Sequence, residues 1–395
     1  MAALNLEPRL QAVMAQEYPR FSAEEYARRH RQLATVMDKA GVDHLLIVTS
    51  NRAGNATQWV TGWPGTVEAL TIFKPGVQMT MYMEWYNHYP LAKIIAPEVD
   101  VQWGGHEGIV RAIAELKRRG AKRIGVIGPL PHMKYGQLEQ HFAVHSLDAA
   151  YTRLRMIKSE EELDWLRIGA ALSDAGLAAL LAGTRVGLDE RELSALVESA
   201  YISHGGTTMI HYIGVTSMAA PHLYVPRQYP SPRKVANGDV VFCELSAFWW
   251  DYAGQVLRTF AVGAEATPLY RDLYRTAEDT FDAVTAVIRH GTTMQEIIDA
   301  SGLVEARGFT ICDDLLHGFG GGYFQPIIGS RSRPAGKLPD MVLEENMTVV
   351  VQPNVTTAGT DDAKRAGVQV GEMIRVTKSG FERMHRAERQ LLRIT

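Results

Sequence analysis

The sequence has few cysteines and no strong excess of charge of either sign. Only Cys243 and Cys312 occur among its 395 residues, too few for a disulfide framework, so we expect a cytoplasmic location. Its 41 Lys and Arg residues stand against 44 Asp and Glu residues, which leaves a formal net charge of −3. The two signs are interspersed along the chain. We therefore expect no nucleic acid and no membrane as a partner.

Long apolar runs are also missing. No stretch approaches the ~20 apolar residues of a membrane span. The N-terminal segment, MAALNLEPRLQAVMAQEYPRF, has no apolar core of signal-peptide length. The composition is that of an ordinary globular protein, and the length is sufficient for two domains.

The patterns along the chain predict an α/β domain over residues 1–151 and an α+β domain over residues 152–395. In the first part, Ser22 with Glu25 three residues later marks a helix start, and Gly41 marks its end. Short apolar runs alternate with such helices there, which is typical of α/β folds. In the second part, Ser159 begins a long helix, and strand-like runs dominate after two further helices.

One strand pair of the second part carries a carboxylate and a carboxamide among apolar neighbours. It runs from Gly238 to Gly263, with Glu244 in the first strand and Gln255 in the second. A two-residue turn at Trp249-Trp250 would pair Glu244 directly with Gln255. That register is provisional, because two Trp residues are poor turn chemistry.

Six phrases of the chain, in their order and spacing, resemble the pita-bread family of methionine aminopeptidases, Xaa-Pro aminopeptidases, prolidases and creatinases. They are LRMIKSEEE, GVTSMAAPH, GDVVF with RTFAVG, LHGFGGG, ENMTVVVQP and GVQVGEMIRVTKSG. The resemblance implies a creatinase-like N-terminal α/β domain and a pita-bread α+β catalytic domain. It also implies a homodimer in which the aromatic turns of one N-terminal domain, around Trp63, complete the partner's site.

Peptidases of this family hold two divalent metals through two Asp, one His and two Glu. Carried over position by position, these ligands fall on Glu244, Gln255, His317, Gln352 and Gly371. The neighbouring acid Glu372 is one residue off, which in a strand means the opposite face. Carboxamides are weak neutral ligands for such metals. We therefore predict a site without metal and an enzyme without a cofactor.

The resulting prediction is a metal-independent, creatinase-like hydrolase that cleaves a C–N bond in a small amide, amidine or cyclic metabolite. A buried carboxyl beside neutral amides has a raised pKa, which suits Glu244 to acid–base or covalent catalysis. His317 and His222 are the other predicted catalytic residues. The family's creatinases have a catalytic Glu where this chain has Leu257, so the ectoine hydrolase-like members are the better match. The predicted substrate-binding residues are Gln255, Gln352, Trp250, Tyr252, Tyr323, Phe324 and Trp63.

Three alternatives stay open. One is an Xaa-Pro metallopeptidase with an atypical single metal held by Glu244, His317 and Glu372. Another is a lyase that acts by proton abstraction with the same residues. The third is an inactive binding homologue, against which the retained buried acid counts, because burying an ionisable group without a use is costly.

Overall fold

The structure is a computed structural model that describes residues 4, 6–50, 53–359 and 365–395. The chain divides into two compact units, residues 12–155 and residues 156–395 together with the chain up to Gln11. The predicted boundary at residue 151 lies within helix α7 (Asp148–Met156), and the division between the units falls at the end of that helix.

The unit of residues 12–155 is built on a mixed six-stranded sheet in the order β4-β3-β2-β1-β5-β6. Helix α2 (Ala23–Ala40) begins where predicted, because the Ser22 hydroxyl accepts the backbone N–H of Glu25 at 3.1 Å. It ends at Gly41, whose φ of 65° suits glycine. The strands are β1 (His44–Thr49), β2 (Ala69–Lys74), β3 (Val77–Met83), β4 (Asp100–Trp103), β5 (Arg123–Ile127) and β6 (Ala143–Ser146). The other helices are α3 (Ala56–Thr61), η1 (Tyr86–His88), α4 (Tyr89–Ile95), η2 (Gly105–Glu107), α5 (Gly108–Arg118) and α6 (His132–Glu139).

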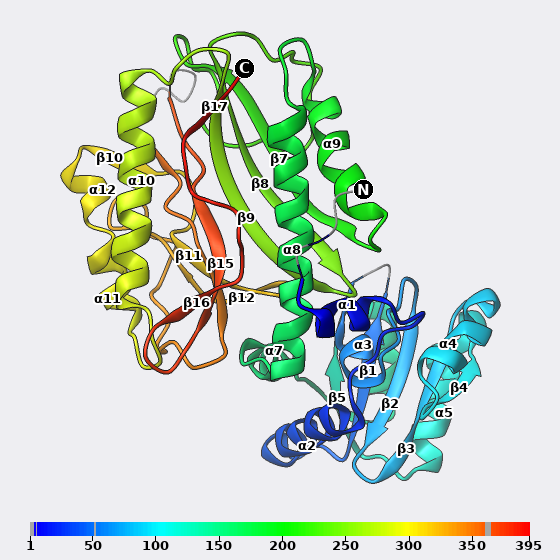
Figure 1. Ribbon diagram of the computed structural model, residues 1–395. Coiled ribbons are helices and arrows are strands. Elements are labelled where there is room, and N and C mark those ends of the chain that lie inside the picture. The colour runs from blue at the N-terminus through cyan, green and yellow to red at the C-terminus, as the bar shows by residue number, and fades with distance from the viewer. Residues whose placement is uncertain (1–3, 5, 51–52, 360–364) are drawn as a thin grey trace. The chain divides into compact units, whose positions relative to one another are not determined.

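The larger unit contains a long sheet in the order β12-β11-β13-β15-β9-β8-β7, with β16 beside β15 and β17 beside β9 (Figure 1). Its strands are β7 (Thr207–Ser217), β8 (Asp239–Trp249), β9 (Tyr252–Val262), β11 (Leu316–Phe319), β12 (Tyr323–Ile328), β13 (Thr348–Val351), β15 (Gly371–Val376), β16 (Phe381–Arg383) and β17 (Leu392–Ile394). A separate pair joins β10 (Phe309–Ile311) to β14 (Val355–Thr357). The helices are α1 (Pro8–Met14), whose residues from Ala12 on are counted with the other unit, α8 (Glu160–Gly183), α9 (Glu190–Ile202), α10 (Pro268–Val287), α11 (Met294–Ala300) and α12 (Leu303–Ala306).

Helix α8 runs along the β8–β9 hairpin (Figure 1). Ser159 and Glu162 form a complete capping box at its start. Farther along, the Ser173 hydroxyl donates to the carbonyl of Gly254 at 2.8 Å and accepts the N–H of Ala247 at 2.9 Å. Among the described residues, α8 is one helix long and apolar enough to cross a membrane. Its close contact with the hairpin makes it a core helix of this unit.

The turn of this hairpin differs from the predicted one. Trp250 and Asp251 are its two central residues, with φ values of 47° and 71°, the arrangement of a type I′ turn. Glu244 therefore faces Leu257, and Gln255 faces Ser246. The predicted direct pair of Glu244 and Gln255 is wrong, because the turn lies one residue later. The register shifts by two residues, however, so both side chains stay on the same face of the sheet.

Candidate active site

The two faces of the β8–β9 hairpin have different surroundings. Glu244, Gln255 and Leu257 point to one face, as pairing and alternation along the strands require. Ala247, Gly254 and their neighbours point to the other face, where α8 packs. The face of Glu244 is the candidate active site.

Glu244 is a buried carboxyl, only 6% exposed, without a cationic partner among the described residues. The amide Nε2 of Gln255 donates to its Oε1, and the hydroxyl of Tyr323 donates to the same oxygen at 3.4 Å. Burial raises the pKa of Glu244 to about 8, the negative charge of Asp313 adds to the rise, and Tyr323 opposes it. This carboxyl can therefore hold or release a proton near neutral pH.

His317 lies on β11, at an irregularity in its pairing with β12. Its Nδ1 is 3.1 Å from the carbonyl oxygen of Gly318, which requires Nδ1 to carry the hydrogen and leaves Nε2 as an acceptor. The His317 ring lies 4.5 Å from that of Tyr323. Burial lowers the pKa of His317 to about 4, so the ring is neutral at pH 7. A side chain at Gly318 would meet the carbonyl oxygen of Gln325 at 2.5 Å, so glycine is required beside the histidine.

Gln352 follows β13 and contacts an acid that sequence reasoning missed. Its Nε2 donates to Oδ1 of Asp314 at 2.9 Å, and its backbone N–H donates to the carbonyl of Leu315. Burial, and then the charge of Asp313, raise the pKa of Asp314 to about 8. The available signal was the adjacent pair Asp313-Asp314, which comes immediately before the apolar start of the LHGFG segment.

Five buried polar atoms on or beside the Glu244 face have no hydrogen-bond partner within the described part of the chain. They are Oε1 of Gln255, Oε1 of Gln352, Oδ2 of Asp314, Nε2 of His317 and Oγ of Ser246. Buried polar atoms are nearly always hydrogen-bonded in folded proteins. Their concentration around Glu244 and Asp314 therefore indicates a region built to contact a polar ligand.

Of the other predicted site residues, His222 lies away from Glu244 within the larger unit, and Trp63 belongs to the other unit. His222 is exposed in a loop, where its Nδ1 lies 3.0 Å from the hydroxyl of Thr216. Thr216 pairs with Val240, four residues along β8 from Glu244, which is roughly 13 Å at the rise of a strand. Trp63 is buried in the unit of residues 12–155, with its ring 6.3 Å from that of His88.

The predicted aromatic residues separate by strand alternation. Tyr323 reaches Glu244, whereas the next residue, Phe324, belongs to the apolar core with the charge of Lys158 over its ring. Tyr252 donates its hydroxyl to Glu162 of α8 at 3.0 Å, on the far side of the hairpin. Trp250 is half-buried at the turn. The structure thus brings Tyr323, Gln255, Gln352 and His317 around the Glu244 face, and leaves Tyr252 and Phe324 outside it. A tyrosine that sequence reasoning missed, Tyr212, lies directly opposite Glu244 on β7.

Glu372 lies on the opposite face, as the one-residue offset predicts. It pairs with Val256 and accepts from Nη2 of Arg258 at 2.7 Å and from Nε of Arg383 at 2.5 Å. Burial alone would raise the pKa of Glu372, but the hydrogen bond from Arg383 and the charge of Arg258 hold it below its usual value. The three residues of the predicted single-metal alternative, Glu244, His317 and Glu372, are therefore not assembled in one place.

The ligand set that the resemblance implies does not fit the residues present. At the five positions this chain offers one carboxylate, one imidazole, two carboxamides and Gly371. A Cβ atom at Gly371 would lie 2.6 Å from the carbonyl oxygen of Val351 and 2.9 Å from Cα of Gln352, so the fifth position has no room for a side chain. The described residues contain no group of three or more His, Cys, Asp and Glu side chains placed to hold a metal ion.

Comparisons with known proteins show relatives whose similarity extends over nearly the whole chain. It is 22% identical over 377 residues to the Xaa-Pro dipeptidase of Pyrococcus horikoshii, which covers 92% of this chain and 98% of the relative. The crystal structure of the prolidase from Pyrococcus horikoshii OT3 superposes with a TM-score of 0.78 at 21% identity, covering 92% and 99% of the two chains. The X-Pro aminopeptidase from Thermotoga maritima has a TM-score of 0.76 at 16% identity, covering 92% and 100%.

The family match corrects one prediction and confirms another. Residues 164–378, more than half of the chain, match the metallopeptidase family M24. The prediction of a metal-independent, creatinase-like enzyme is therefore wrong at the level of the family, because the family is one of metallopeptidases and the matched relatives are named Xaa-Pro dipeptidases. That prediction rested on the replaced ligands alone, and the misfit of those residues is a feature of this chain within its family. The predicted fold, an N-terminal α/β domain and a pita-bread catalytic domain, is confirmed, and the chain belongs to the metallopeptidase family M24.

Proposed function

We propose that this chain is a hydrolase that cleaves the amide bond of a short peptide, with an Xaa-Pro dipeptide as the substrate class. The observation that carries the proposal is Glu244, a buried carboxyl without a cationic partner in the described residues, at the centre of the family's catalytic fold. Groups with strongly shifted pKa values gather at catalytic sites. The substrate class is supported by the relatives, which are named Xaa-Pro dipeptidases.

In this proposal Glu244 moves the proton that amide hydrolysis requires. Gln255 and Tyr323 both donate to Oε1, which fixes the carboxyl and leaves Oε2 to exchange a proton with the substrate or with water. With a pKa of about 8, Glu244 can give a proton to a departing amine and take one from an attacking water. The neutral His317 offers Nε2 as an acceptor that orients a donor of the substrate or the water.

A metal ion would supply Lewis-acid activation of the carbonyl or of the water in a metallopeptidase. We assign no step to such an ion here, because the residues at the five family positions do not fit one.

A second candidate is the hydrolysis of a small non-peptide amide or amidine by the same residues. The observation that favours it is the replacement of charged ligands by Gln255 and Gln352, whose amides suit hydrogen bonds to a planar polar substrate.

The experiment is a substrate panel on the purified full chain. It contains Xaa-Pro dipeptides, dipeptides without proline, and small amides and amidines, each assayed with added Mn²⁺ and with a chelator. We expect hydrolysis of at least one Xaa-Pro dipeptide, and a loss of about 10²–10⁴-fold in Glu244→Gln.

Glu278→Gln is the matched control for that variant. Burial raises the pKa of Glu278 as well, but this residue lies on α10 and not on the Glu244 face, so activity should persist. No hydrolysis of any Xaa-Pro dipeptide in either condition would refute the peptidase proposal, and hydrolysis of small amides alone would favour the second candidate. A Glu244→Gln variant with more than a few per cent of wild-type turnover would remove Glu244 from the mechanism.

We also propose a homodimer and a cytoplasmic location. In the described structure both cysteines are buried and free, which fits a reducing compartment, where disulfides are rare, and burial raises the pKa of each thiol to about 12. Light scattering at micromolar concentration tests the dimer, and a monomer there would contradict it.

A further inference from the structure

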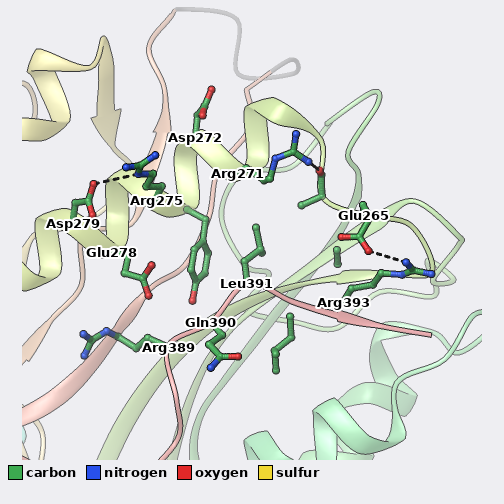
Figure 2. A pocket seen from close by; sticks show the side chains of 14 residues that line it. Glu265, Arg271, Asp272, Arg275, Glu278, Asp279, Arg389, Gln390, Leu391 and Arg393 are labelled. Carbon is green, nitrogen blue, oxygen red and sulfur yellow. Dashed lines mark hydrogen bonds and ion pairs between the residues drawn. The ribbon is translucent and has the colours of Figure 1, made fainter.

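A groove of about 630 Å³ lies between helix α10 and the C-terminal segment of residues 389–393 (Figure 2). Its lining shares no residue with the candidate active site. Part of its wall is apolar and consists of Ala261, Ala266, Leu391 and Leu392. Leu391 is half-buried and Leu392 is 39% exposed. The groove therefore offers an apolar surface that a ligand can cover.

Two hydrogen-bond donors of this groove have no partner within the described part of the chain. They are the hydroxyl of Tyr274, a residue only 4% exposed, and Nε of Arg389. Burial raises the pKa of Tyr274 although the charge of Arg389 opposes the rise, so the hydroxyl keeps its proton at neutral pH. The Nε–H of an arginine can only donate. Because buried donors are nearly always hydrogen-bonded, two unpartnered donors in one groove indicate that a ligand supplies the acceptor.

Two arginines on α10 add positive charge to the same groove. Arg271 donates to the carbonyl of Ala266, and it forms no ion pair with the described residues. Arg275 lies 3.9 Å from Asp279, whose closer partner is Arg307 at 2.7 Å. Residues four positions apart lie on one side of a helix, so Arg271 and Arg275 face the groove together. This charge favours an anionic acceptor over a neutral one.

The acids of the groove cancel little of this charge. Glu265 is paired with Arg393 at 2.7 Å. Burial raises the pKa of Glu278, so this carboxyl binds a proton more readily than an exposed one. Asp272 is exposed, and its carboxylate points away from Leu391 (Figure 2). An anion between α10 and the C-terminal segment therefore meets more unpaired positive charge than negative charge.

We propose that this groove binds an organic carboxylate that carries a short hydrocarbon chain. Tyr274 and Arg389 donate to the carboxylate, and Arg271 adds a compensating charge. The chain lies against Leu391 and Leu392. This site goes beyond the proposed function, and its test requires no turnover.

The test compares three probes on the purified full chain at neutral pH. Hexanoate has both the carboxylate and the chain, hexanamide has the chain without the charge, and acetate has the charge without most of the chain. We expect calorimetry or ligand-observed NMR to show that hexanoate binds at least about tenfold more tightly than either of the others. Charge-assisted hydrogen bonds favour it over the amide, and buried methylene groups favour it over acetate.

Tyr274→Phe should weaken hexanoate binding by about tenfold or more, because it removes a hydrogen bond to a charged group. Tyr270→Phe is the matched control. It also removes an unpartnered buried hydroxyl from α10, but Tyr270 does not line the groove, so binding should not change. Arg271→Gln should weaken binding too, since it removes a cation from an exposed position. It decides the question if circular dichroism shows that Tyr274→Phe does not fold.

Equal binding of hexanoate and hexanamide, or no binding of hexanoate, would overturn the site. Unchanged hexanoate binding in a folded Tyr274→Phe variant, or an equal loss in Tyr270→Phe, would overturn it as well. Inorganic phosphate is the last probe. If it binds more tightly than hexanoate and loses affinity in Tyr274→Phe, the groove is a site for an inorganic anion and the organic carboxylate is refuted.

Discussion

Glu244 and Glu372 are two buried carboxyls of one sheet, on opposite faces, and their chemistry differs completely. Glu244 is 6% exposed and Glu372 is fully buried, so burial alone would raise both pKa values. Glu372 accepts from Arg258 and Arg383, and its pKa falls. Among the described residues Glu244 accepts from an amide and a phenol only, and its pKa rises to about 8. The charge of these two buried acids is therefore decided by their hydrogen-bond partners and not by how deeply they are buried.

The comparison also separates structure from function within one sheet. A carboxylate held by arginines stabilises a fold as long as every member of the network is present. A buried carboxyl without a cationic partner lowers the stability of the fold, so its presence indicates a use in function. The face of Glu372 is accordingly the structural face, and the face of Glu244 is the one that we assign to catalysis.

The largest effect on stability should come from Glu372→Gln. It leaves the buried Arg258 without its counter-charge, which costs about 3–5 kcal/mol of unfolding free energy. Urea unfolding at pH 7 measures this loss. A change within about 0.5 kcal/mol of the wild type would mean that the arginine network does not stabilise the fold, and the comparison would fail.

Glu244→Gln should change stability in the opposite direction, and only at higher pH. The pKa of Glu244 is about 8 when folded and near 4.5 when unfolded, so the folded state binds the extra proton between these values. Wild-type stability therefore falls as pH rises from about 5 to 8, and a neutral amide avoids this loss. We expect the stability of the variant relative to the wild type to increase by roughly 4 kcal/mol between pH 5 and pH 8.5.

Urea unfolding across this pH range measures the difference. A Glu244→Gln variant that is less stable than the wild type at pH 8.5 would show that Glu244 is held as a carboxylate by a cation.

Added carboxylates should give the Glu244 face the negative charge that a divalent metal ion requires. The double variant Gln255→Asp with Gln352→Glu adds two charges beside Glu244, and we expect it to bind Mn²⁺ at least tenfold more tightly than the wild type. The control is Gln390→Glu, which adds a charge at an exposed position. Calorimetric titration that shows no gain would mean that the two amides do not occupy the family's ligand positions.

The smallest effect on stability is expected at the turn of the β8–β9 hairpin, which sets the register of the two strands. Trp250 and Asp251 have positive φ values, which cost an L-residue about 1–2 kcal/mol, whereas Asn-Gly adopts them readily. Trp250→Asn with Asp251→Gly should raise the unfolding free energy by about 1 kcal/mol and leave turnover unchanged. A fall in turnover with an intact fold would support the predicted role of Trp250 in substrate binding.

Much of this arrangement could be predicted from the sequence, because it follows from periodicity and from motifs in a fixed order. The caps at Ser22 and Ser159 predict their helices, and the offset of Glu372 predicts its face. The turn was misplaced because neither Trp249-Trp250 nor Trp250-Asp251 has favourable turn chemistry, so only the structure distinguishes them.

The missed residues illustrate what a motif cannot show. Asp313 and Asp314 precede a recognisable segment and look like a solvated loop. Their role depends on the hydrogen bond from Gln352 to Asp314 and on the effect of the Asp313 charge on Glu244, and both partners are distant in the sequence. Tyr212 reaches Glu244 only through the pairing of β7 with β8. Tyr252 and Phe324 were assigned by composition, although strand alternation and packing direct them elsewhere.

The tight packing at Gly371 limits how this protein can evolve. The strands around it have closed to the point where even a methyl group would collide with the backbone of Val351 and Gln352. A glutamate there would first have to push β13 and β15 apart, so its cost to the fold comes before any gain of a ligand. Acids at Gln255 or Gln352 need no such opening of the backbone. A single substitution at either glutamine can therefore change the charge of the site, whereas the fifth family position is closed to every side chain unless two strands move.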